Sequence, residues 1–252
     1  MINHPGKRFT MKRNYWQIYW SCKTNGGHRL ITEEFLEKEA SEKLYLLAGG
    51  NNILDVGCGA AELLTYYAVQ YENCIGADQS ETMLYYARKR IENLRLNHRI
   101  KLIHQPDFRV WEELKLNFRD DCPFDRITAG QLIQYLDKEQ IDSFIANSVK
   151  FLAPNGKIWL FDIVDSRTYE LWKSGLYKMN DLNISILLKI IIRRMRDSAR
   201  ILTGKPVSDM GYGYAPMFFI AIAQKYGLQV SFINSMYYEY RYHAVFSQSN
   251  VS

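Results

Sequence analysis

The stretch of sequence that decides the fold reads Ile53-Leu54-Asp55-Val56-Gly57-Cys58-Gly59-Ala60-Ala61-Glu62. The apolar run at 53–56 predicts a buried strand, and the pattern that follows this stretch predicts a helix. Gly57 and Gly59 lie between the two, where glycine lets the backbone turn sharply and lets a ligand approach without meeting a Cβ atom. A glycine-rich turn between a strand and a helix is the context that a nucleotide-binding loop requires.

The chain around this loop alternates short apolar runs with helical patterns, which predicts a mostly parallel sheet with helices on both faces. After the first strand, further strands are expected at 74–78, 100–104, 124–129, 157–163, 228–234 and 241–247. Only six residues join the last two strands, and so short a connection fits an antiparallel pair. We therefore expect one reversed strand at the C-terminal end of the sheet.

An acidic residue follows the second predicted strand. Asp78 stands twenty-one residues after Gly57, where a carboxylate can accept hydrogen bonds from both ribose hydroxyls of an adenosine. Glu62 would repel the pyrophosphate of a dinucleotide, which disfavours an NAD-dependent dehydrogenase. The loop and Asp78 together therefore indicate a ligand that contains an adenosine.

Residues from about 50 to 165 resemble the core of class I S-adenosylmethionine-dependent methyltransferases. The segments that carry the resemblance are 53–59, 76–84, 106–108, 124–131 and 152–157. The resemblance implies an α/β, Rossmann-like fold with a seven-stranded, mostly parallel sheet and a reversed last strand, and it implies S-adenosylmethionine as the cofactor. The family usually has a third glycine where this chain has Ala61, and we expect the loop to keep its shape if this position needs no positive φ.

The resemblance also suggests which residues form the site. The expected cofactor-binding residues are Asp55, Gly57, Cys58, Gly59, Asp78, Gln79, Met83, Asp107, Phe108 and Gly130. Candidates for contact with the acceptor are Tyr15, Trp16, Tyr19, Gln131, Gln134 and Tyr135. His243 and Asp162 are weak candidates for a general base, and both also fit a purely structural role in a strand. Asp107 and Phe108 would recognise adenine, with helix capping and core packing as their structural alternatives.

Composition narrows the choice of partners. The chain has 252 residues, of which 47% are hydrophobic and 23% charged, as in a globular protein. Its formal net charge is +5, and the segment 178–205 alone carries seven basic and two acidic residues. This mild excess does not point to nucleic acid, so we expect at most peripheral membrane contact, or an anionic substrate, at 178–205. The four cysteines are scattered, which indicates no metal site and a reducing, cytoplasmic location.

Four regions are expected along the chain. They are an N-terminal helical cap at 1–50, a cofactor-binding core at 51–164, a helical insertion over the acceptor site at 165–210, and a C-terminal helix and strand pair at 211–252 that completes the sheet. The two regions outside the strand–helix alternation, 1–50 and 165–210, would shape the acceptor site because ligands lie at the carboxyl ends of parallel strands.

The expected activity is methyl transfer from S-adenosylmethionine to a nitrogen or oxygen atom of a small-molecule acceptor. Nitrogen is slightly favoured, because an oxygen acceptor needs a general base and the sequence shows no His-x-x-x-Asp arrangement. The motif Asn/Asp-Pro-Pro-Tyr, which marks many relatives acting on nucleic-acid bases, is also absent from the sequence. The alternatives are O-methylation of a sugar or lipid-linked glycan, RNA modification, and a non-catalytic cofactor-binding subunit.

Overall fold

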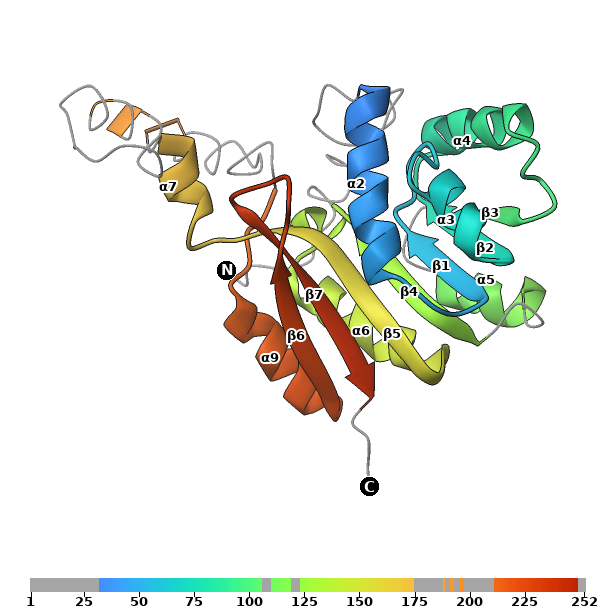
Figure 1. The fold of residues 1–252 in the computed structure, drawn as a ribbon. Coiled ribbons are helices and arrows are strands. Elements are labelled where there is room, and N and C mark those ends of the chain that lie inside the picture. The colour runs from blue at the N-terminus through green and yellow to red at the C-terminus, as the bar shows by residue number, and fades with distance from the viewer. Residues whose placement is uncertain are drawn as a thin grey trace, which may run out of the picture.

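The computed structural model describes residues 32–105, 110–118, 123–174, 188, 191–192, 195–196 and 211–248. Seven strands form one twisted sheet in the order β3-β2-β1-β4-β5-β7-β6 (Figure 1). Their bounds are β1 Asn52–Val56, β2 Asn73–Asp78, β3 Ile100–His104, β4 Phe124–Gly130, β5 Leu152–Val164, β6 Leu228–Asn234 and β7 Arg241–Gln248. β1 to β5 are parallel, and β7 runs antiparallel to both β5 and β6. The predicted fold, including the reversed last strand, is confirmed.

Helices alternate with the strands, and α4 and α6 begin at residues suited to capping them. Their bounds are α2 Glu33–Leu46, α3 Leu64–Gln70, α4 Glu81–Asn93, α5 Val110–Asn117, the 3-10 turn η2 Ile133–Tyr135, α6 Lys138–Lys150, α7 Tyr169–Ser174 and α9 Pro216–Lys225. The hydroxyl of Ser80 accepts the backbone N–H of Met83 in the first turn of α4, and Asp137 with Gln140 forms a capping box at the start of α6.

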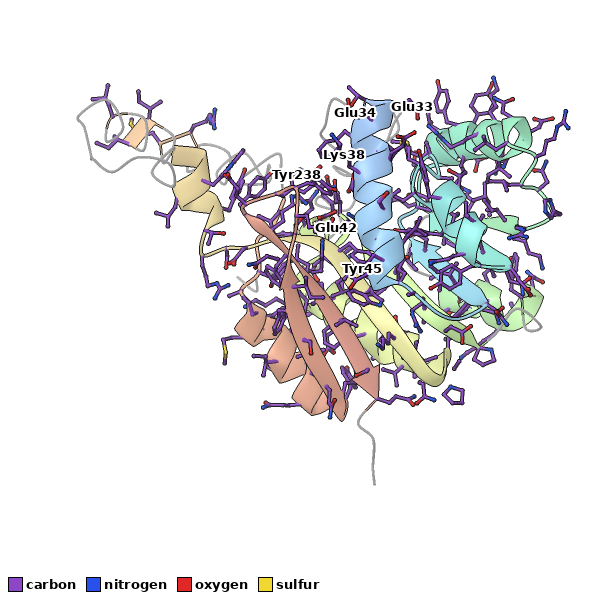
Figure 2. All side chains as sticks on the ribbon, in the orientation of Figure 1. Glu33, Glu34, Lys38, Glu42, Tyr45 and Tyr238 are labelled. Atoms are coloured by element: carbon purple, nitrogen blue, oxygen red, sulfur yellow. The ribbon has the colours of Figure 1, made fainter. Side chains whose placement is uncertain are left out.

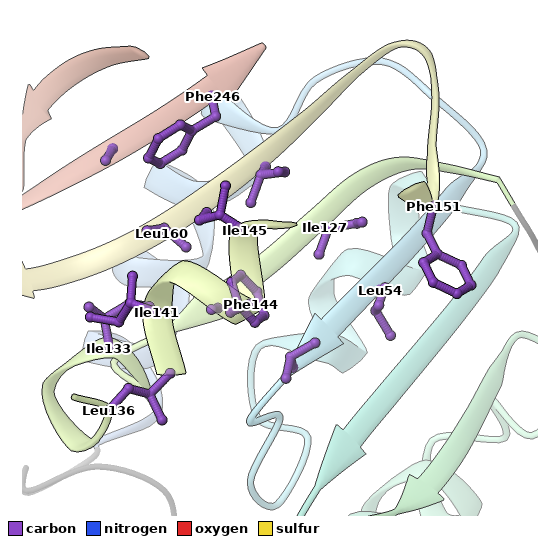
Figure 3. Packing of buried hydrophobic residues seen from close by; sticks show 14 of the residues in the cluster. Leu54, Ile127, Ile133, Leu136, Ile141, Phe144, Ile145, Phe151, Leu160 and Phe246 are labelled. Atoms are coloured by element: carbon purple, nitrogen blue, oxygen red, sulfur yellow. The ribbon is translucent and has the colours of Figure 1, made fainter. Parts of the chain in front are cut away.

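The core has one layer on each face of the sheet. On one face, Trp111 of α5, Phe144 of α6 and Phe219 of α9 pack on the strands, and Figure 3 shows Phe144 of this layer close to Ile127 and Leu160. On the other face, Tyr67 of α3 and Leu84 of α4 pack on the opposite sides of the same strands. Because both faces are covered, the central strands β1 and β4 bury side chains on both faces of the sheet.

β5 differs from its prediction in length and in regularity. It begins at Leu152 rather than at Lys157, because Leu152 already pairs with Phe124 of β4. Its register with β7 shifts between Leu160 and Ile163, and Asp162 has a left-handed φ of 55° inside this irregularity. Such bulges re-aim side chains, and they are frequent beside active sites.

The segment after β5 leads away from the sheet. Figure 1 shows α7 beyond the carboxyl end of β5. Of the basic segment 178–205, the structure describes five residues, all helical and exposed: Leu188, Ile191, Ile192, Met195 and Arg196. None of the helices in the described part of the chain is both long and apolar enough to cross a bilayer. The boundaries expected at 50, 165 and 210 stay predictions.

Candidate functional site

The glycine loop is fastened to the neighbouring strand. The backbone N–H groups of Gly57 and Cys58 both donate to the carbonyl oxygen of Ala77 on β2, at 2.7 and 3.1 Å. Gly57 has a φ of 78° and Gly59 a φ of 57°, so both use the left-handed conformation that glycine allows. A Cβ atom on Gly57 would come within 3.1 Å of the Leu132 side chain. The loop therefore lies against the carboxyl ends of β1 and β4, where the strand order changes direction and ligands bind.

The sequence predicts that the loop keeps its shape with Ala61 if this position needs no positive φ. The loop keeps its shape, but Ala61 adopts a φ of 60°, so the position does need a positive φ. Its methyl group is fully buried. A left-handed alanine costs about 1–2 kcal/mol, and burial of the methyl group in the core beside α3 offsets part of this cost.

Asp78 connects β2 to the loop. One carboxylate oxygen accepts the N–H of Gly59 at 2.9 Å, and the other accepts the N–H of Ser80 at 2.8 Å. Burial raises the pKa of Asp78 above its ordinary value, while these backbone donors lower it. Each carboxylate oxygen has two lone-pair sites, so Asp78 retains the capacity to accept two further hydrogen bonds from a ribose.

Three carboxylates surround the loop: Asp55, Glu62 and Asp78, which we call the loop carboxylates. Asp55 is buried and accepts a hydrogen bond from the hydroxyl of Thr128 on β4, at 2.8 Å. Burial raises the pKa of Asp55 to about 7, against a lowering by Thr128, and the charges of Asp78 and Glu62 raise it further. Such a site favours a cation and repels phosphate. A sulfonium and an ammonium group satisfy this preference, so the residues present fit S-adenosylmethionine.

Thr128 and Glu62 were not among the predicted site residues. Glu62 belongs to the loop segment itself and is buried, so its place in the motif could have identified it. Thr128 is also fully buried, and nothing in its local sequence pattern distinguishes it from its neighbours on β4, because its role depends on the pairing of β4 with β1.

The other predicted cofactor-binding residues differ in their burial and in their position relative to the glycine loop. Cys58 packs over Gly76, where an added Cβ would lie 2.9 Å from its sulfur. Burial raises the pKa of the Cys58 thiol, so it has no reactive thiolate. Met83 is buried in the first turn of α4, Gln79 is partly buried before that turn, and Gly130 ends β4, where an added Cβ would lie 4.0 Å from the Leu63 side chain. Asp107 and Phe108 lie outside the described residues.

The turn after β4 carries buried amides. Gln131 has a φ of 52°, and its N–H donates to the carbonyl oxygen of Phe161 on β5 at 3.1 Å. The side-chain nitrogen of Gln131 and both side-chain amide atoms of Gln134 are buried and make no hydrogen bond with the residues that the structure describes. Tyr135 is half-buried beside them. Tyr15, Trp16 and Tyr19 lie outside the described residues.

The two candidate bases, Asp162 and His243, belong to a buried charge cluster that joins α2 to the sheet. We call it the α2 cluster, and its members are Glu39, Glu42, Lys43, Asp162 and His243, all buried. The ammonium group of Lys43 lies 2.9 Å from Asp162, 3.1 Å from Glu39 and 3.6 Å from Glu42. Figure 2 shows Glu42 on α2 beside the β6–β7 connection that carries Tyr238, and the N–H of Met236 in that connection donates to Glu42 at 2.7 Å.

The hydrogen bonds of His243 fix its tautomer. Its Nδ1 accepts the backbone N–H of Asp162 at 3.0 Å, so the ring proton lies on Nε2 and is donated to Glu42 at 3.1 Å. Ligand atoms of Glu42, Asp162 and His243 come within 4.8 Å of one another. A metal would need the Nε2 lone pair, which this tautomer does not offer, and the Lys43 ammonium already supplies the positive charge. Both candidate bases are thus committed to other partners.

Comparisons with known proteins concern the domain and the fold. A family model described as a methyltransferase domain matches residues 53–156. No curated protein sequence matches the chain. Magnesium protoporphyrin IX methyltransferase from Synechocystis PCC 6803, solved with bound S-adenosylhomocysteine, is similar in structure, with a TM-score of 0.58 and 12% identity over 94% of this chain and 100% of that one.

Two further solved structures share the fold. An O-methyltransferase family protein from Burkholderia thailandensis has a TM-score of 0.59 and 13% identity over 95% of this chain and 60% of that one. A cyclopropane synthase from Mycobacterium tuberculosis has a TM-score of 0.55 and 17% identity over 88% of this chain and 71% of that one. At these identities the structures show the fold, and the family model shows the domain. Residues 53–156 therefore form a methyltransferase domain, in a fold that the chain shares with solved methyltransferase structures.

Proposed function

We propose that this enzyme transfers the methyl group of S-adenosylmethionine to a nitrogen atom of a small-molecule acceptor, with an oxygen atom as the alternative. The observation that carries the proposal is the group of loop carboxylates beside the left-handed glycines at the carboxyl edge of the sheet. The bound cofactor supplies an electrophilic methyl group on a sulfonium. The protein supplies a negative environment, a fixed orientation and exclusion of water.

Each loop residue has a role in this proposal. Gly57 and Gly59 let the cofactor approach the backbone closely. Asp78 accepts hydrogen bonds from the ribose hydroxyls through its remaining lone pairs. Asp55 and Glu62 compensate the positive charge of the sulfonium and the ammonium group, and Thr128 orients Asp55 through their 2.8 Å hydrogen bond.

The acceptor is expected to meet the turn after β4. Gln134 is 1% exposed, and its side-chain amide makes no hydrogen bond within the described part of the chain. A buried amide without partners costs free energy that a bound polar group recovers. Gln131 and Gln134 would therefore hydrogen-bond a polar part of the acceptor, with Tyr135 and the aromatic residues Tyr15, Trp16 and Tyr19 as further proposed contacts.

A nitrogen acceptor is favoured because both candidate bases are engaged in other contacts. An oxygen acceptor needs a group that takes its proton, and His243 and Asp162 are both held in the α2 cluster. A nitrogen acceptor needs only to arrive unprotonated. Small molecules are favoured because structural relatives include a magnesium protoporphyrin IX methyltransferase and a mitomycin 7-O-methyltransferase.

The test is transfer of an isotopically labelled methyl group. The protein is incubated with methyl-labelled S-adenosylmethionine and a cell extract separated into metabolites, lipids and RNA, and labelled products are identified by mass spectrometry. We expect label on a nitrogen atom in the metabolite fraction and none with Asp78→Ala. Label confined to RNA, or label that persists with Asp78→Ala, would contradict the proposal, and label on oxygen would select the alternative.

A further inference from the structure

Each polar group of Asp162, in its backbone and in its side chain, contacts a partner. Its N–H donates to His243 at 3.0 Å, and its carbonyl oxygen accepts from Arg241 at 2.6 Å. One carboxylate oxygen accepts the hydroxyl of Ser235 at 3.1 Å, and the other pairs with Lys43 at 2.9 Å. These partners come from α2, from β7 and from the connection before β7. Four independent contacts thus determine the position of one residue at the carboxyl end of β5.

These contacts hold Asp162 in an unfavourable conformation. Its φ of 55° is left-handed, and its register with β7 is interrupted. Non-glycine residues in this conformation persist only where their surroundings impose it, and they are concentrated at functional sites. The imposed conformation therefore calls for a functional explanation.

A second left-handed residue is coupled to it. Gln131 follows β4 with a φ of 52°, and its N–H donates to the carbonyl oxygen of Phe161, the residue directly before Asp162. The bulge at Asp162 thus fixes the direction of the carbonyl that receives Gln131. Gln131 opens the turn that carries the side-chain amide of Gln134, which has no hydrogen-bond partner among the described residues. The backbone oxygen of Gln134 accepts the N–H of Tyr212 at 2.6 Å.

Stability alone does not account for the charges of the α2 cluster. The buried face of α2 includes Glu39, Glu42 and Lys43. Apolar residues of similar size at such positions usually stabilise a protein as well or better, whereas a buried ionic network can select one arrangement among several. We infer that the α2 cluster selects the position of the β5 bulge against α2. Lys43 contacts both residues at the bulge, because it pairs with Asp162 and its ammonium group lies 5.5 Å from the ring centre of Phe161.

We propose that Asp162 is a positioning residue for methyl transfer: clamped by Lys43, His243, Ser235 and Arg241, it sets the Phe161 carbonyl and, through Gln131, the turn that presents Gln131 and Gln134 to the acceptor. The assignment rests on the proposed function, because it needs an acceptor at that turn. Under this assignment Asp162 is not the general base. Lys43 contributes to the reaction by holding Asp162 in place, without contacting the substrate.

The test uses Asp162→Asn, which keeps the size of the side chain and removes the charge facing Lys43, and Lys43→Met. Lys38→Met is the matched control, because Lys38 lies on the exposed side of the same helix and pairs with Glu34 (Figure 2). The first readout is hydrogen exchange of the Gln131 and Tyr212 amides in the full protein. We expect exchange at least tenfold faster in both cluster variants, no change in Lys38→Met, and affinity for S-adenosylmethionine within twofold in all three.

The second readout is turnover of the labelled acceptor. Positioning predicts a fall of at least tenfold in kcat for Asp162→Asn at every pH, without the loss of a pH-dependent limb that removal of a base would cause. If Asp162→Asn does not fold, Ser235→Ala removes one clamp contact and should accelerate Gln131 exchange to a smaller extent. Unchanged Gln131 exchange in folded variants would overturn the assignment, and this result does not depend on methyl transfer, so it is separable from failure of the proposed function.

Discussion

Cofactor binding should release a proton from Asp55 at neutral pH. Burial raises the pKa of this carboxyl group to about 7 in the free protein, so about half of the molecules hold the proton at pH 7. A positive charge at about 4–6 Å lowers the pKa of a carboxyl group by about 1–3. Binding of the cationic cofactor would then leave Asp55 almost fully ionised. We expect release of about half a proton per cofactor bound at pH 7, and almost none at pH 9.

The assay is isothermal titration calorimetry with S-adenosylmethionine in two buffers that differ in ionisation enthalpy. The dependence of the observed heat on that enthalpy gives the number of protons released. Asp55→Asn is the matched variant, because it keeps the side chain's shape and its hydrogen bond with Thr128 while removing the titrating group. Heats independent of the buffer at pH 7, or the same proton release from Asp55→Asn, would refute the reasoning.

The same pKa predicts how stability depends on pH. The folded carboxyl group keeps its proton up to about pH 7, whereas the unfolded one loses it near its ordinary value of 3.8. The folded state therefore binds more protons between these values, and the free energy of unfolding of the free protein should fall as the pH rises from about 4 to 7. At about 1.4 kcal/mol for each pH unit, Asp55 contributes a fall of about 4 kcal/mol, which Asp55→Asn should abolish in denaturant titrations.

Further predictions concern the cofactor, the cap and the insertion. Asp78→Ala should weaken S-adenosylmethionine binding by about 1.5–3 kcal/mol for each ribose hydrogen bond lost, measured by calorimetry. Asp107→Asn should weaken it less, because one adenine contact is involved, and normal binding would leave helix capping as its role. Deleting residues 1–21 should keep cofactor affinity within about tenfold, or about 1.4 kcal/mol, and abolish turnover, whereas retained turnover would show that these residues only pack. The double variant Ile191→Glu/Ile192→Glu should abolish sedimentation of the protein with anionic phosphatidylglycerol vesicles. Both isoleucine side chains are more than half exposed and are next to basic residues in the sequence, a combination that favours binding to a membrane surface. Equal sedimentation of variant and wild type would exclude membrane contact at these residues.

The sheet could be predicted because its signals are local. Buried parallel strands such as 53–56 are continuous apolar runs, and the six-residue connection before β7 allows only an antiparallel return. The glycine loop and Asp78 could be predicted for the same reason, since their spacing follows from one strand–loop–helix–strand unit. The structure places them in contact through the hydrogen bond from Gly59 to Asp78.

The α2 cluster could not be predicted from sequence. Glu39, Glu42 and Lys43 belong to a helix whose pattern is that of a solvated charged surface, yet all three are buried. Their partner His243 is 201 residues away from Glu42, and only the return of β7 beside β5 brings it there. The left-handed conformation of Asp162 likewise gave no local signal, because aspartate tolerates this conformation without requiring it and the contacts that hold it come from α2 and β7.

The most direct test of the account is a crystal structure of the protein with S-adenosylmethionine. We predict that the ribose hydroxyls lie about 3 Å from the Asp78 carboxylate, that the sulfonium lies against the loop carboxylates Asp55 and Glu62, and that the methyl group faces the turn bearing Gln131 and Gln134. A cofactor bound elsewhere, or one whose ribose makes no contact with Asp78, would contradict the account.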